Sequence, residues 1–152
     1  MMASNEEVIS TLNDLIETCR DGQNGFETAA DGVKNPELKE LFNSYSRQRA
    51  GFVGALQDEV RRMGGEPEDS GTVAGALHHG WMNIKSVVTG GDDNSIITEC
   101  ERGEDSALTA YRDALGKDMP AGVRSTVERQ FSQVKEAHER IRALEGATGA
   151  GA

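Results

Sequence analysis

Two glutamates in the stretch "ECERGEDSALTAYRDAL" (residues 99–115) could carry chemistry, because they lie on or beside the apolar stripe of a helix. Glu104 comes four residues after Cys100 and four before Leu108, and residues four apart share one face of an α-helix. Glu101 lies beside this stripe. A carboxylate turned toward a core needs a metal ion or a cationic side chain as its partner. The spacing therefore predicts a polar site inside the protein.

A histidine and an arginine are placed to meet these glutamates. His138 lies on the apolar stripe of the last helix, and it is level with Glu101 when the last two helices fold as a hairpin about residues 118–120. Arg49 lies on the apolar face of an earlier helix, and a rise of about 1.5 Å per residue puts it within about one turn of the height of Glu104. We expect these side chains to converge in the core.

In a first interpretation, the converging residues bind iron or manganese. Ferritin-like di-iron sites take a Glu from each of two helices and a Glu-x-x-His motif from each of the other two. This chain departs from that pattern, because it has Arg49-x-x-Phe52 in the second helix and Lys135-x-x-His138 in the last. A partial metal site or an oxidase centre would use the remaining candidates, which are Glu27, Glu101, Glu104 and His138.

In a second interpretation, the guanidinium of Arg49 replaces the positive charge of the metal. Arg49, Glu101, Glu104 and His138 would then form a buried ionic layer that fixes the register of the helices. This interpretation needs no catalytic residue, no metal and no other cofactor. In a third interpretation, these side chains reach solvent from flanking positions and nothing polar is buried.

Five helices are expected to position these residues. The N-caps expected are Ser4, Asn35, and either Asp92 or Asp93. The segments expected are 5–33, 36–63, 72–89, 94–117 and 120–145. The first is expected to continue through Gly22 and Gly25, with a break there as the alternative. Close approach of helices is the expected use of these glycines and of Gly51 and Gly54.

The fold class predicted is all-α, a ferritin-like four-helix bundle. Four of the segments are long, and the short third one is placed as a crossover helix between the second and third long helices. A bundle with one long crossover is the ferritin-like arrangement. We expect a single domain over residues 1–145 and a flexible C-terminal tail over residues 146–152.

Charge and composition limit the partners. The net charge of −10 argues against nucleic acid and anionic membranes as partners. The start "MMASNEEVIS" lacks a secretory pattern, and no apolar run approaches the ~20 residues of a membrane span. Cys19 and Cys100 are expected to be buried free thiols in a reducing cytoplasm. A homo-oligomer is left open.

Four stretches resemble a bacterial ferritin-like four-helix-bundle family that is known only as a domain of unknown function. They are "LNDLIETCRDGQNGFETAA" (12–30), "LHHGWMNIKS" (77–86), "ECERGEDSALTAYRDAL" (99–115) and "VKEAHERIRAL" (134–144). The resemblance implies a cytosolic bundle protein and no particular activity. Together with Arg49 it favours a non-enzymatic, stress-associated bundle. The alternatives are a metal-binding protein or oxidase, and a module that presents the Trp81 helix to a protein partner.

Overall fold

The computed structural model describes residues 4–67 and 80–150, except for the side chains of residues 146–150. The described residues form five helices and no strand, which confirms the all-α class. The helices are α1 (Asn5–Gly32), α2 (Pro36–Arg62), α3 (Ile84–Gly90), α4 (Asp93–Leu115) and α5 (Ala121–Ala150).

The long helices begin where the sequence places their caps. The side chains of Ser4, Asn35 and Asp92 accept backbone N–H hydrogen bonds at 3.2, 2.8 and 2.9 Å in the first turns of α1, α2 and α4. Each bond satisfies a donor that the helix itself leaves without a partner. Helix α1 runs unbroken through Gly22 and Gly25, as expected.

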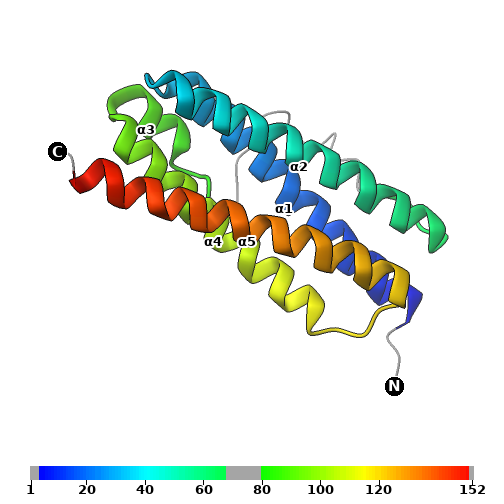
Figure 1. Ribbon diagram of the computed structural model, residues 1–152. Helices are drawn as coiled ribbons and strands as arrows, with labels where there is room; N and C mark the ends of the chain where they lie inside the picture. The colour runs from blue at the N-terminus through cyan, green and yellow to red at the C-terminus, as the bar shows by residue number, and fades with distance from the viewer. Residues whose placement is uncertain (1–3, 68–79, 151–152) are drawn as a thin grey trace.

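The four long helices form two hairpins that pack side by side (Figure 1). Helices α1 and α2 make the first hairpin, and α4 and α5 make the second. Helices α2 and α4 run in the same direction, so the chain returns along the length of the bundle between them. This is the four-helix arrangement with one long crossover that the sequence predicts. Helix α3 lies at the end of the bundle where α4 begins.

The crossover differs from the expected helix over 72–89. Residues 72–79 of that prediction lie outside the described residues, and the helix seen there is only α3. Residues 80–83 are not helical, because Gly80 has a φ of 92°, in the left-handed region that favours glycine. The prediction that Trp81 lies on a helix is therefore wrong.

The last helix is longer than expected. Helix α5 continues to Ala150, so the helix end expected at residue 145 is wrong. Alanine is the strongest helix former, and Ala147 and Ala150 offset part of the helix cost of the glycines around them. The glycines of this segment therefore do not end the helix at residue 145.

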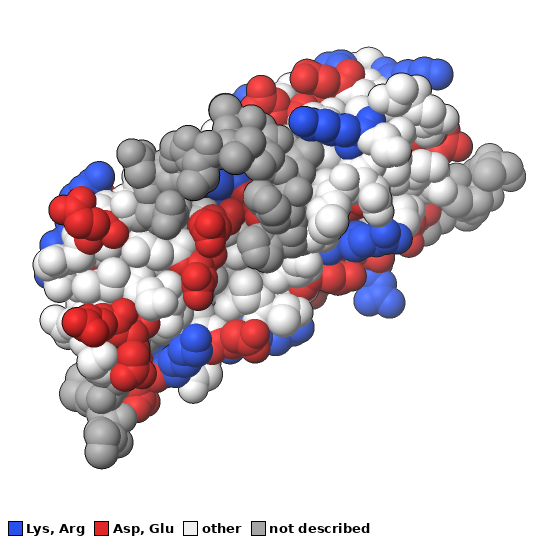
Figure 2. Space-filling view, turned by 180° about the vertical axis from the view of Figure 1, so that it is seen from behind, with Lys and Arg blue, Asp and Glu red and all other residues white. Residues whose placement is uncertain are grey.

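Two hydrophobic clusters fill the bundle, one toward each end. One cluster contains Leu12, Leu56 and Tyr111, and the other contains Phe26, Phe42 and Trp81. Among the described residues, no helix is long and apolar enough to cross a lipid bilayer. Carboxylates and cations are interspersed over the face shown in Figure 2.

Candidate functional site

Arg49 of α2 and Glu104 of α4 form a buried ion pair between the two hydrophobic clusters. The Arg49 Nη1 and Nη2 atoms donate to Glu104 Oε1 and Oε2 at 2.5 and 2.7 Å, so the pair is bidentate. Only 2% of the Arg49 side chain and 0% of the Glu104 side chain are exposed. The pairing expected from the sequence is confirmed.

The surroundings of Arg49 are shaped to hold its long side chain. In the described bundle α2 and α4 are not neighbours, so the side chain crosses the centre to reach its partner. A Cβ at Gly22 would lie 3.3 Å from Nη1, which makes a small residue useful there. The guanidinium carbon lies 5.3 Å from the ring centroid of Phe26 and 5.8 Å from that of Phe52. These rings belong to the two different clusters, so Arg49 joins them.

The electrostatics of the pair keep Arg49 charged. Burial by itself lowers the pKa of the guanidinium, but the charge and hydrogen bonds of Glu104 raise it above its ordinary value. An arginine is protonated at every ordinary pH in any case. The centre of the bundle therefore carries a permanent positive charge, with a carboxylate against it.

A second buried network, which the sequence analysis missed, links all four long helices. The Tyr111 hydroxyl donates to Gln130 Oε1 at 2.7 Å, and Gln130 Nε2 donates to the Phe52 carbonyl at 3.4 Å. The Cys19 thiol lies 3.1 Å from the same hydroxyl. Gln130 lies four residues before the buried Val134, and this helical spacing is the signal that could have revealed it.

Both cysteines are unreactive in this environment. They are free and buried, as expected. Burial raises the pKa of the Cys19 thiol to about 11, although the hydrogen bond to Tyr111 and the charge of Arg49 act in the opposite direction. Burial likewise raises the pKa of Cys100 well above its ordinary value. At neutral pH both side chains are thiols rather than nucleophilic thiolates.

Two members of the expected layer lie outside the ion pair. His138 Nε2 lies 2.6 Å from Asp105 Oδ1, near the surface, because Asp105 points about 100° away from its neighbour Glu104 on the helix. Glu101 is half-buried, and its Oε2 atom has no hydrogen-bond partner. Glu27 is exposed. The structure therefore brings together Arg49 and Glu104 but neither Glu101, His138 nor Glu27.

These residues do not fit a metal pair at the bundle centre. Both oxygens of Glu104 accept hydrogen bonds from Arg49. Over residues 4–67 and 80–150, no group of three or more His, Cys, Asp and Glu side chains is placed to hold a metal ion. The site is a salt bridge and not a set of free ligands.

The crossover packs onto the bundle beside this pair through Trp81. A Cβ at Gly25 of α1 would lie 2.2 Å from Trp81 Cε3, and one at Gly103 of α4 would lie 2.1 Å from Cε2. The indole is therefore held between two glycines, with the Phe26 ring at a centroid distance of 4.9 Å. We call this arrangement the Trp81 socket.

Two expectations from the sequence change with the Trp81 socket. Gly25 makes room for a side chain of the crossover and not for close helix approach, and an added Cβ at Gly51 or Gly54 would meet nothing within 4 Å. Trp81 is only 2% exposed. The interaction-module interpretation requires that Trp81 is presented to a partner, and a buried Trp81 does not meet this requirement.

Comparison with known proteins gives a matching family model and several similar solved structures. The family model described as "Domain of unknown function (DUF2383)" matches residues 7–117. A crystal structure of a two-domain protein from Anabaena variabilis, with DJ-1/ThiJ/PfpI-like and ferritin-like domains, matches with a TM-score of 0.82 and 15% identity. The match covers 97% of this chain and 41% of that one, so this chain spans less than half of that protein. A search of curated protein sequences finds no match.

Proposed function

The chain belongs to the family described as Domain of unknown function (DUF2383) and has a ferritin-like fold, and from this premise we propose that it is a non-enzymatic bundle that works without a central metal. The observation that carries the proposal is the buried bidentate pair between Arg49 and Glu104. In this proposal the bundle has a structural role, and partners bind at its surface.

The charge of Arg49 opposes metal binding at the centre. A guanidinium beside Glu104 stabilises the carboxylate and repels an entering cation. A metal that took Glu104 as a ligand would leave Arg49 buried without a partner, and breaking a buried pair in this way costs about 3–5 kcal/mol. The motif Arg49-x-x-Phe52 also lacks the Glu and His that a di-iron site needs on this helix.

Metal analysis of protein purified without chelator tests the proposal. We expect much less than one equivalent of iron, manganese or zinc, and no acceleration of Fe²⁺ oxidation over buffer. The matched variant Arg49→Glu with Phe52→His restores the missing motif and should bind metal more tightly than the unmodified protein if it keeps its helical circular dichroism.

One equivalent of iron or manganese in the unmodified protein, lost in Glu104→Ala, would overturn the proposal. It would favour the metal-binding alternative built on Glu101, Glu104 and His138. Glu128→Ala serves as the control, because Glu128 is exposed on α5 and is not one of the candidate ligands. The helical circular dichroism of Glu104→Ala separates loss of a ligand from loss of fold.

Several finer expectations stay predictions. They are the role in stress, the homo-oligomer, the cytoplasmic location and the lack of a nucleic-acid or membrane partner. The net charge of −10 supports the view that nucleic acid is not a partner.

A further inference from the structure

A groove along the outer face of α2 gathers cations in an otherwise acidic protein. It has a volume of about 320 Å³ and is lined by Lys34, Pro36, Lys39, Glu40, Asn43 and Arg47. Small-molecule sites have volumes of about 300–1,000 Å³, so the groove is at the small end of that range. Three of its six lining residues are cations, although the chain has a net charge of −10.

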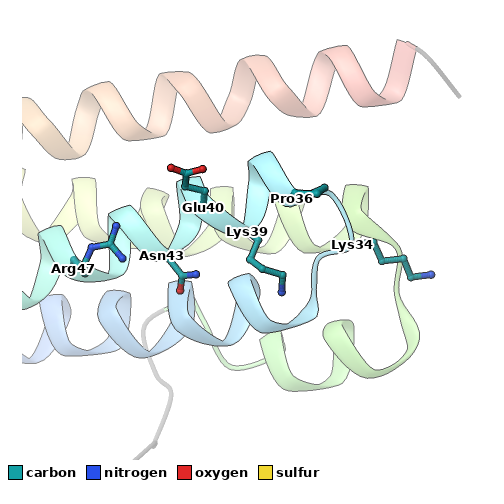
Figure 3. A pocket seen from close by; sticks show the side chains of 6 residues that line it. All are labelled: Lys34, Pro36, Lys39, Glu40, Asn43 and Arg47. Atoms are coloured by element: carbon teal, nitrogen blue, oxygen red, sulfur yellow. The ribbon is translucent and has the colours of Figure 1, made fainter.

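The α2 side chains that line the groove leave the helix on two sides. Lys39, Asn43 and Arg47 follow at intervals of four residues, so they form one row on the helix. In Figure 3, Lys39 and Asn43 point to one side of α2 and Glu40 points to the other. Lys34 extends from the loop between α1 and α2.

Two of these cations, Lys39 and Arg47, are not neutralised within the described part of the chain. Lys34 lies near Asp92, and it adds to the hydrogen bonds of Ser95 in lowering the pKa of that carboxyl. None of Lys34, Lys39 and Arg47 forms an ion pair with a carboxylate there. Lys39 Nζ donates to the Ala30 carbonyl at 2.7 Å, which fixes its position and leaves two of its three N–H groups free. A cation near the last carbonyls of α1 is favourable in itself. This contact does not account for the positions of Arg47 and Asn43 in the same row.

We propose that this groove binds a small molecule that carries two anionic groups, either phosphates or carboxylates. Lys39 and Arg47 are eight residues apart, about 12 Å along the helix. A single anionic group is too small to lie beside the helix at both positions. Two groups can be held, one by the ammonium of Lys39 and the other by the bidentate guanidinium of Arg47. The Asn43 amide lies between them in the row and can donate to either.

The proposal is independent of the metal question. The groove lies on the outer surface of α2, whereas Arg49 is 1% exposed and points into the bundle. Binding in the groove can therefore succeed or fail whatever the metal content of the bundle centre.

Titration calorimetry with inorganic pyrophosphate and, separately, citrate tests the proposal in metal-free buffer of low ionic strength. We expect saturable 1:1 binding with a Kd of about 1 mM or less, and added salt should weaken it. In nuclear magnetic resonance spectra of the same titration, the side-chain amide resonances of Asn43 should shift. Tighter binding of pyrophosphate supports the site and assigns phosphate groups. Tighter binding of citrate supports it and assigns carboxylates.

The variant Arg47→Ala should weaken binding by about tenfold, because a charge-assisted bidentate contact is lost. Arg129→Ala on α5 is the matched control: it removes the same charge from another exposed position and should change the Kd less than twofold. The absence of saturable binding, or an equal loss in both variants, would overturn the proposal. Both residues are exposed, so neither variant threatens the fold.

Discussion

A single long side chain, Arg49, crosses the centre of the bundle and ends against Glu104. The sequence could predict this pair because each residue breaks an apolar stripe, and a buried charge of one sign requires the other. The sequence placed His138 level with Glu101, whereas in the structure His138 lies against Asp105. A turn of about 100° between adjacent helix positions decides which carboxylate faces the core.

Removal of one member of the pair should destabilise the protein strongly. We expect Arg49→Ala to lower the free energy of unfolding by about 3–5 kcal/mol, because Glu104 is left buried and unpaired. The double variant Arg49→Met with Glu104→Leu should recover most of this loss, because no charge is then left unpaired. Urea denaturation of the four proteins in the cycle measures both effects. An unchanged midpoint in Arg49→Ala would contradict a buried pair.

The Cys19 thiol makes stability sensitive to high pH. Burial raises its pKa from 9.0 to about 11, so the folded state holds the proton more tightly than the unfolded state does. The contribution of this thiol to the free energy of unfolding is complete below about pH 9 and is lost as the pH rises toward 11. We expect the free energy of unfolding to fall over this range, with an effect on the order of 2 kcal/mol from this group.

The variant Cys19→Ala isolates this effect. Burial also raises the pKa of Cys100 and Tyr111, so the variant should retain part of the alkaline loss of stability while showing a shallower fall than the unmodified protein. Denaturation curves taken between neutral and alkaline pH supply the comparison. Equal slopes in the two proteins would show that Cys19 takes no part.

At the scale of the helices, capping residues, which act over only a few positions, were sufficient to predict where three of the long helices begin. Ser4 and Asn35, together with a choice between Asp92 and Asp93 that the structure resolves as Asp92, predicted these starts, because cap hydrogen bonds depend only on the adjacent turn. The crossover was not predictable in this way. Trp81 fits a helical period with Ile84, but its position is decided by glycines that are distant in the sequence.

The Trp81 socket reverses the usual effect of replacing a helical glycine. Gly→Ala in a helix interior stabilises by about 0.5–1 kcal/mol where space allows. At Gly103 the new Cβ would lie 2.1 Å from the indole, so Gly103→Ala should instead destabilise by about 1–3 kcal/mol. Thermal and urea denaturation give the sign directly.

The control for this prediction lies in α2. An added Cβ at Gly51 meets nothing within 4 Å, so Gly51→Ala should stabilise by about 0.5–1 kcal/mol. The prediction rests on the opposite signs of the two alanines. Stabilisation by both would mean that the indole moves aside at little cost.

At the scale of the whole molecule, contacts distant in sequence join the two hairpins. Helices α1 and α4 pack directly, whereas α2 and α5 approach each other less closely. Gln130 of α5 reaches the Phe52 carbonyl of α2 across the second of these seams. The sequence predicted the order and direction of the helices from length and punctuation. It did not predict this bond, because the acceptor is a backbone carbonyl, which no pattern of side chains marks.

Trp81 should report the unfolding of the entire molecule, because it contacts both hairpins at once. It is the one tryptophan in the sequence, and its indole is held between Gly25 of the first hairpin and Gly103 of the second. Separation of the hairpins removes the socket, and loss of the indole from the socket leaves a cavity beside Phe26. We therefore expect the urea transitions followed by tryptophan emission and by far-ultraviolet circular dichroism to coincide, as in a two-state domain. A shift of the emission at clearly lower urea than the loss of helix would mean that the crossover detaches from an intact bundle.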